Sequence, residues 1–190
     1  MTISEIIAKR LDLRQQQVEN TMELLEGGAT IPFISRYRKE ATGGLNEVQV
    51  AQINDLNTQL GELVHRREYI LETIEAQGKL TDTLRQRISE CWEATVLEDI
   101  YLPFKPKRKT RAEAARQKGL EPLAQQLMLT PHVNPMKAAE KFVTEEVPDV
   151  EAALQGARDI IAEHVSEDER TRQTLRHTFE RTAVISSKVV

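Results

Sequence analysis

The stretch from Glu47 to Gln77 contains no proline and a single glycine, Gly61. Its apolar residues recur at steps of three and four, the spacing that places side chains on one face of an α-helix. They are Ile53, Leu56, Leu60, Leu63, Ile70 and Ile74, with Arg67 in the one position that interrupts the row. One helix over residues 47–77 is about 46 Å long at 1.5 Å per residue, longer than most helices of globular proteins. The sequence therefore predicts a long helix against which several other elements pack.

The residues before this stretch predict a short helical hairpin. Thr2 and Glu5 have the spacing of a capping box, and apolar residues follow at helical intervals. Asp12 is placed to cap a second helix, which we expect to stop at Gly27-Gly28. Such a pair is either a DNA-reading helix-turn-helix or a plain helical hairpin, and the plain hairpin is the commoner structure.

Helix signals continue to the end of the chain. The expected starts lie at Pro32, Thr81, Thr110, Glu121-Pro122 and Asn134-Pro135, and the helix that begins after Thr81 is expected to carry Leu84, Ile88 and Trp92. Periodicity predicts two further helices over Val150–His164 and Glu167–Thr182, with Ser166 and Glu169 as the capping pair of the second. Aromatic residues make up only 4% of the chain, which argues against a sheet-rich fold. We therefore expect an all-α multi-helix scaffold without a sheet of three or more strands.

Composition suggests where the protein works. The single cysteine, Cys91, cannot form a disulfide within the chain, which is typical of intracellular proteins. The N-terminal sequence MTISEIIAKRLDL has no signal-peptide pattern, and no apolar run approaches the length of a membrane span. We expect a soluble, cytoplasmic protein in which residues 1–190 form one helical domain. The apolar, β-branched ending AVISSKVV is unusual for a solvated terminus and suggests a fragment of a longer protein.

Positive charge is concentrated in one segment of an otherwise acidic chain. Between Lys105 and Lys118 the cations are Lys105, Lys107, Arg108, Lys109, Arg111, Arg116 and Lys118, and the one acid is Glu113. The segment thus carries 7 minus 1, or +6, while the whole chain carries -4, which leaves -10 for the remainder. Such an uneven field indicates a charged partner.

The basic segment has three possible roles. Pro103 and Pro106 are expected to stiffen an extended loop whose cations meet successive phosphates without reading base edges. Alternatively, Arg108 and Arg111 pair with acids of the chain such as Glu98 and Asp99, or the loop docks on an acidic protein surface. These alternatives remain open at the level of sequence.

A second, weaker candidate site consists of Arg36, Tyr37, Arg38 and Lys39. Tyr37 could stack on a base while its basic neighbours hold the backbone. Phe33, Ile34 and Tyr37 also lie at helical spacing, however, and this pattern more often marks a buried face with arginines that reach past it to water. The sequence favours the buried face.

No catalytic or metal-binding motif is apparent. The four histidines, His65, His132, His164 and His177, lack paired ligand spacing, and Cys91 has no second cysteine. The glycine pairs in EGGAT and ATGGLNE lack the lysine of a P-loop and the spacing of a dinucleotide fingerprint. We expect no enzymatic activity, no metal and no cofactor.

Several longer motifs resemble a known family. The segments IPFISRYRKEATGGLNE, EAQGKLTDTL, LEDIYLPFKPKRKTRAEAARQKGLEPLA and ALQGARDIIAE are similar, in this order, to the N-terminal region of the bacterial transcription accessory protein Tex family. Phe104 and Lys109 depart from the tyrosine and arginine that are usual there. The resemblance implies a helical N-terminal part of a longer protein that also carries a ribonuclease H-like domain, helix-hairpin-helix elements and an oligonucleotide-binding barrel.

The resemblance also implies nucleic-acid binding without an established enzymatic activity. Two hypotheses follow for the chain. In the first, its basic loop contributes non-sequence-specific contact with RNA or DNA. In the second, the chain is an architectural scaffold that binds the downstream domains of its own protein or the transcription machinery, such as RNA polymerase.

Overall fold

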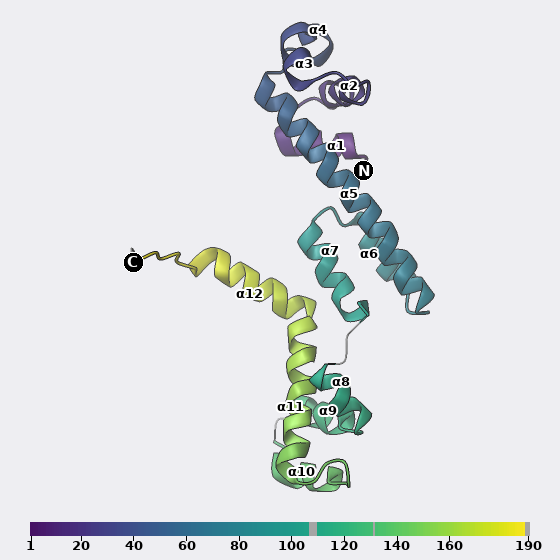
Figure 1. The fold of residues 1–190 in the computed structure, drawn as a ribbon, viewed down its shortest axis with the longest axis vertical. Helices are drawn as coiled ribbons and strands as arrows, with labels where there is room; N and C mark the ends of the chain where they lie inside the picture. Colours follow the sequence, from purple (N-terminus) through teal and green to yellow (C-terminus); the bar gives the residue numbers. More distant parts are fainter. Residues whose placement is uncertain (107–109, 131, 189–190) are drawn as a thin grey trace. The chain divides into compact units, whose positions relative to one another are not determined.

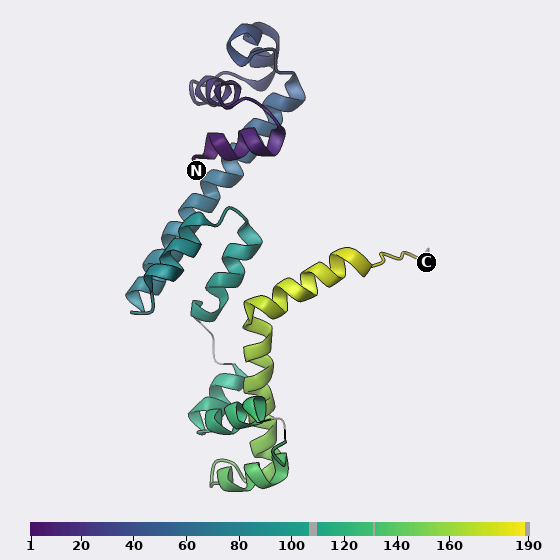
Figure 2. The same cartoon turned by 180° about the vertical axis from the view of Figure 1, so that it is seen from behind.

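The computed structural model describes residues 1–106, 110–130 and 132–188. In these ranges the chain forms twelve α-helices and no β-strand, apart from an isolated bridge between Thr144 and Val147. The all-α prediction is confirmed. The chain forms two compact units, Met1–Leu97 (unit 1) and Glu98–Val190 (unit 2) (Figures 1 and 2). The assignment of residues 1–190 to one domain stays a prediction.

Unit 1 is built around one long helix, as predicted. Its helices are α1 (Ile3–Leu11), α2 (Gln15–Glu26), α3 (Ile31–Tyr37), α4 (Lys39–Thr42), α5 (Glu47–Ala76) and α6 (Asp82–Glu90), and α7 (Ala94–Tyr101) begins in this unit. Helices α1, α2, α3 and α6 contact α5, with α6 beside its C-terminal half (Figures 1 and 2). The buried side chains of α5 are Val50, Ile53, Leu60, Leu63, Ile70 and Ile74, while Leu56 is only half-buried. The predicted apolar row is therefore the face of α5 that forms the core.

Arg67, which interrupts this row, lies against the segment that follows α6. Its guanidinium lies 4.1 Å from the centroid of the Trp92 ring and donates a hydrogen bond to the carbonyl of Ser89. Trp92 was expected on the helix that begins after Thr81, but that helix ends at Glu90. The indole thus contacts α5 through a cation–π interaction from outside the helix.

Two predicted helix caps are wrong, although the helices exist. Asp12 does not cap α2: it adopts a left-handed conformation with φ of 53° and ends α1, and α2 begins after Arg14. Ser166 does not begin the last helix, because its hydroxyl donates to the carbonyl of Glu163 within α11. Asp168 caps α12 instead, where its carboxylate accepts from the backbone N–H of Thr171. Asp168 thus supplies the capping group expected of Ser166. The side chain of Arg14 does not cap α2 in place of Asp12; the backbone N–H of Arg14 instead donates to Oε1 of Gln17 over 3.3 Å.

Unit 2 packs short helices against one long one. Its elements are the end of α7, a 3₁₀ turn (Leu102–Phe104), α8 (Arg111–Gln117), α9 (Glu121–Leu129), α10 (Pro135–Ala139), a second 3₁₀ turn (Glu140–Phe142), α11 (Val150–Glu167) and α12 (Glu169–Thr182). Helices α8, α9 and α10 all contact α11. The predicted starts at Thr110, Glu121-Pro122 and Asn134-Pro135 are confirmed.

A glycine allows α8 and the residue that precedes α9 to approach α11 closely. A Cβ atom added to Gly156 of α11 would lie 2.4 Å from Cδ1 of Leu120 and 3.2 Å from Cβ of Ala115. Both neighbours are buried, with exposed fractions of 1% and 5%. Since protein interiors are close-packed, the two side chains have little room to move away. Gly156 therefore determines how closely the basic segment is held to the core of unit 2.

We expect Leu60→Ala to lower the free energy of unfolding by roughly 2–5 kcal/mol, because this side chain is only 2% exposed and its removal leaves a cavity. Val48→Ala on the same helix is the control, since Val48 is 66% exposed, and it should change stability by no more than about 0.5 kcal/mol. Chemical denaturation followed by circular dichroism measures both. A loss below about 1 kcal/mol for Leu60→Ala would contradict its place in the core.

A pair of glycine substitutions tests the contact between α8 and α11. Gly61→Ala should stabilise α5 by about 0.5–1 kcal/mol, because alanine is the better helix former and nothing lies within 4 Å of the added Cβ atom. Gly156→Ala gains the same propensity but should destabilise unit 2 through overpacking, which typically costs about 1–3 kcal/mol. Thermal unfolding compares the two variants. Equal stabilisation by both would show that α8 is not held tightly against α11.

Candidate nucleic-acid interface

The basic segment begins directly after α7. Leu102–Phe104 forms a 3₁₀ turn with Pro103 in its first positions, so the extended loop predicted around Pro103 is not found there. The backbone N–H of Lys105 donates to the carbonyl of Tyr101 over 3.1 Å, and its own backbone is extended. Lys105 and Pro106 are exposed. The predicted site residues Lys107, Arg108 and Lys109 lie outside the described residues.

Helix α8 divides the remaining cations of the segment between two sides. Thr110 caps the helix by accepting the N–H of Glu113 over 3.0 Å, and Ala112 and Ala115 are buried. Arg111 and Lys118 are exposed and line one hollow of about 310 Å³. Glu146 and Asp159 also line it, so carboxylates lie near these two cations. In the described part of the chain no ion pair of Lys105, Arg111 or Lys118 is present.

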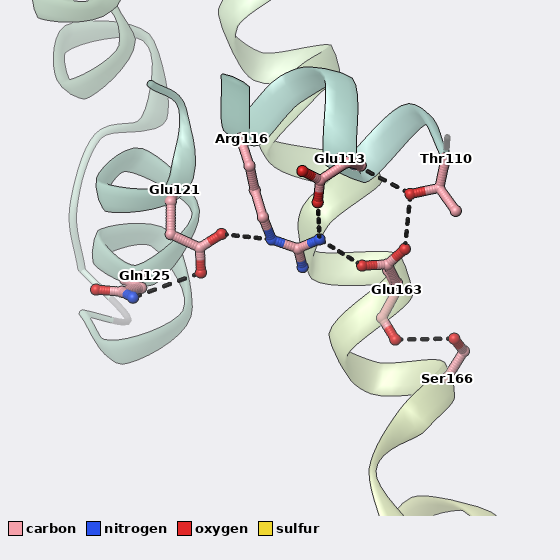
Figure 3. Close-up of polar contacts among 7 residues, drawn as sticks. All are labelled: Thr110, Glu113, Arg116, Glu121, Gln125, Glu163 and Ser166. Atoms are coloured by element: carbon pink, nitrogen blue, oxygen red, sulfur yellow. Dashed lines mark hydrogen bonds and ion pairs between the residues drawn. The ribbon is translucent and has the colours of Figure 1, made fainter. Parts of the chain in front are cut away.

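Arg116 occupies the opposite side of α8, among three carboxylates (Figure 3). Its Nη1 lies 2.6 Å from Oε2 of Glu163 and 3.8 Å from Oε2 of Glu113, and its Nε donates to Oε2 of Glu121 over 2.9 Å. Burial by itself lowers the pKa of Arg116, but the hydrogen bonds to Glu163 and Glu121 outweigh it and raise the pKa above its ordinary value. Arg116 thus joins α8, α9 and α11.

Glu163 completes this network. Its side chain is 12% exposed, and its second carboxylate oxygen accepts a hydrogen bond from the hydroxyl of Thr110 over 2.9 Å. Charge-assisted hydrogen bonds of this kind are the stronger ones in proteins. The N-cap of α8 and Arg116 are therefore both held by one carboxylate of α11. The predicted site residue Arg116 is thus occupied by carboxylates of its own unit.

The second candidate site lies where α3 meets α4, in unit 1. Arg36, Tyr37, Arg38 and Lys39 are all exposed, and Tyr37 is 70% exposed. Ile34 is fully buried, as a core face requires, but the expectation that Tyr37 shares this buried face is wrong. The reason is that the helix breaks at Arg38, whose φ of -124° ends α3 and begins α4.

Comparison with known proteins identifies the family. The model of the Tex-like protein N-terminal domain matches residues 1–75, and the Tex central region-like model matches residues 130–190. The transcriptional accessory protein Tex of Neisseria gonorrhoeae is 44% identical over 190 residues, which cover 100% of this chain and 25% of that protein. The chain belongs to the Tex family. Protein YhgF of Escherichia coli is 44% identical over 187 residues, which cover 97% of this chain and 24% of that protein.

A more distant relative is named for an RNA-binding domain. The human S1 RNA-binding domain-containing protein 1 is 24% identical over 174 residues, which cover 91% of this chain and 18% of that protein. By comparison, the chain spans about a quarter of the length of the two bacterial relatives, Tex and YhgF. The resemblance to the Tex N-terminal region, inferred from motifs in the sequence, is confirmed.

The N-terminal hairpin of this Tex chain is poorly suited to enter a DNA groove through its second helix. Helix α2, Gln15–Glu26, contains Glu19, Glu23 and Glu26 and neither lysine nor arginine. Phosphates that flank a groove repel a helix of this charge. Together with the contacts of α1 and α2 to α5, this charge favours the plain helical hairpin.

Among the described residues no helix is both long and apolar enough to cross a membrane.

Asp99, which the sequence offered as a partner for the basic segment, binds two other arginines. Its Oδ1 accepts from Nε of Arg172 over 2.6 Å, and its Oδ2 accepts from Nη2 of Arg176 over 2.7 Å. The carboxylate is 2% exposed. Burial by itself raises its pKa, but the hydrogen bonds from the two arginines outweigh it and hold the pKa of Asp99 below its ordinary value. No local sequence pattern had pointed to Arg172 and Arg176, which lie one helical turn apart on α12.

The lowered pKa of Asp99 predicts a pH-dependent contribution to the stability of unit 2. Because the unfolded carboxyl titrates near about 3.9, the contribution is complete well above that pH and is lost as the pH falls through the lower folded pKa. Asp99→Asn should cost roughly 1–3 kcal/mol at neutral pH. Denaturation at a series of pH values should show this difference constant above about pH 5 and shrinking below about pH 4. A difference that does not change with pH would contradict the ion pairing.

Proposed function

We propose that the chain is the helical N-terminal module of a Tex-like transcription accessory protein and that its Lys105–Lys118 segment contributes non-sequence-specific contact with RNA or DNA. The observation that carries the proposal is a segment of +6 in a chain of -4. The exposure of Lys105, Arg111 and Lys118 supports it, because these cations remain available to a partner. The relative whose name includes an S1 RNA-binding domain is consistent with nucleic acid as that partner.

The proposed contact is to the phosphate backbone. Arg111 and Lys118 lie at the two ends of α8, a helix of seven residues, and such a spacing does not aim several side chains at adjacent base edges. The remaining -10 of the chain and the nearby Glu146 and Asp159 repel phosphates. We therefore expect a dissociation constant no tighter than about 10⁻⁶ M at physiological salt for the 190-residue chain. We propose a binding role in the cytoplasm and no catalysis.

An architectural scaffold is the second candidate function, and an exposed apolar surface on unit 2 favours it. Val165, Leu175 and Phe179 are 44%, 54% and 66% exposed. Val165 and Leu175 line a largely apolar hollow of about 710 Å³ at the junction of α11 and α12. Exposed apolar surface of this kind often marks a protein contact. The downstream domains of the same protein, or the transcription machinery such as RNA polymerase, are the proposed partners.

The salt dependence of binding separates the two functions. Replacing Lys105, Arg111 and Lys118 together by glutamine removes up to three phosphate partners, so the slope of log affinity against log salt should shrink by up to about 2.7 on duplex DNA. A second triple variant, with glutamine at residues 107–109, should lower the salt slope by the same amount. The matched control is Lys137, Lys141 and Arg170 to glutamine, three exposed cations of the same unit. Fluorescence anisotropy with several DNA and RNA sequences measures the slopes, and all sequences should weaken alike.

Two outcomes would contradict phosphate binding. One is that neither triple variant lowers the slope more than the control does. The other is that the control lowers it equally, which would show a general effect of net charge. The scaffold predicts unchanged slopes and weaker docking of the downstream domains in the full-length protein. Arg116→Gln shows how a cation with a purely structural role behaves. This variant should lower the free energy of unfolding and leave the salt slope of nucleic-acid binding unchanged.

A further inference from the structure

The junction of α3 and α4 displays an aromatic pair beside three cations, a surface that we call the α3–α4 elbow: Phe33, Arg36, Tyr37, Arg38 and Lys39. The centroids of the Phe33 and Tyr37 rings lie 5.4 Å apart, with an interplanar angle of 44°. The Arg38 guanidinium lies 5.4 Å from the centroid of the Phe33 ring. Phe33 is 40% exposed and Tyr37 is 70% exposed, so both rings reach the surface.

The cations of the elbow are available to a ligand. In the part of the chain that the structure describes, no ion pair of Arg36, Arg38 or Lys39 is present. Glu40 is the one acid between residues 36 and 40, so this short stretch carries 3 minus 1, or +2. This arrangement contrasts with Arg116, whose charge three carboxylates surround.

Helix α2 holds the elbow in place through its side chains. The Asn20 amide donates to the carbonyl of Ala41 over 2.7 Å, and the Gln17 amide donates to the carbonyl of Thr42 over 3.1 Å. The fully buried hydroxyl of Thr42 donates to the carbonyl of Arg38 over 3.1 Å. A Cβ atom on Gly43 would lie 2.8 Å from the Gln17 amide nitrogen. The backbone that carries the cations is thus ordered before any ligand arrives, which reduces the entropic cost of binding.

Two hollows meet at the elbow. Arg36, Tyr37 and Lys39 line one of about 360 Å³, and Phe33 lines another of about 760 Å³ with the backbone of Gly27-Gly28. Arg38 lines both. A flexible, charged ligand that crosses Arg38 could therefore place one part in each hollow. Glu23, in the larger hollow, disfavours an anionic group there and leaves that space to a neutral one.

We propose that the α3–α4 elbow binds single-stranded nucleic acid, with an unpaired base stacked on Tyr37 and the adjoining phosphates held by Arg36 and Lys39. An unpaired base offers a free aromatic face and a phosphate on either side, and these two features match the ring and the cations. A duplex hides the faces of its bases, and an acidic peptide would pair with the cations but leave the Tyr37 ring without a partner. The elbow thus fits single strands better than either.

This inference does not depend on the basic segment, because the elbow lies in unit 1 and residues 105–118 lie in unit 2. The experiment is therefore carried out with the 190-residue chain in which Lys105, Lys107, Arg108, Lys109, Arg111 and Lys118 are already glutamine. In this variant, any remaining single-strand binding can be assigned to the elbow even when the basic segment no longer binds. If the elbow does not bind either, the proposed function of the basic segment is not affected.

The test compares Tyr37→Ala with Tyr37→Phe on a fluorescein-labelled uridine oligonucleotide and on a DNA duplex of the same length. Anisotropy should show that Tyr37→Ala weakens single-strand binding by about 5- to 150-fold, the loss that corresponds to one stacked base. Tyr37→Phe should retain the affinity, because the phenyl ring stacks equally well, and duplex binding should change by less than about twofold. Arg36→Gln with Lys39→Gln should lower the single-strand salt slope by up to about 1.4. A 5-iodouridine oligonucleotide should cross-link to the peptide that contains Tyr37.

Several results would overturn the proposal. If Tyr37→Ala binds the single strand with unchanged affinity and circular dichroism shows an intact fold, no base stacks on Tyr37. An equal loss on single strand and duplex, or no retention by Tyr37→Phe, shows that the ring does not stack on a base. A labelled polyglutamate peptide provides the remaining comparison. If it binds as tightly as the oligonucleotide and loses as much affinity in Tyr37→Ala, the elbow is a site for acidic protein segments instead.

Discussion

Along α5, a row of side chains from Val50 to Ile74 is removed from water by α1, α2, α3 and α6, and the placement of these helices follows from that burial. Each fully buried aliphatic side chain contributes about 1.5–3 kcal/mol relative to exposure. A helix of 30 residues with such a face cannot remain alone in water. Even Arg67, the polar interruption in the row, takes part through the Trp92 ring. Because α3 is fixed in this way, the elbow that follows it has a definite position in unit 1.

Two contrasting classes stand out among the cations of the chain, and their sequence neighbourhoods do not separate them. Arg116, Arg172 and Arg176 each bind at least one carboxylate that is no more than 12% exposed, and they connect elements of unit 2. Arg36, Lys39, Arg111 and Lys118 are exposed, and no ion pair of theirs is found within the described ranges. Arg111 and Arg116 belong to the same seven-residue helix and still differ in class. Cations of the second class are available to an external phosphate without the loss of an existing ion pair, whereas those of the first class are not.

Local sequence predicted the helices well and their caps less reliably. The starts at Thr2, Thr81, Thr110 and Asn134 were correct, because a side chain next to an apolar repeat can satisfy free N–H groups without help from elsewhere. The error at Ser166 arose where two polar residues competed for one role, and the error at Asp12 arose because its left-handed backbone ends α1. Tyr37 was misjudged for a related reason: its helical spacing to Ile34 was real, but α3 ends at that residue.

The sequence by itself determined the helical class, the long helix and its core face, the Tex family and the existence of a basic segment. These properties depend on residues close together in the chain, or on motifs long enough to be specific. The tertiary structure decided which charges are used internally, since Asp99 and Arg172 are 73 residues apart and Arg116 and Glu163 are 47 apart. The tertiary structure also decided that the Phe33 and Tyr37 rings of the α3–α4 elbow lie at the surface. Exposure and ion pairing between distant residues depend on how helices pack, and no local pattern encodes that packing.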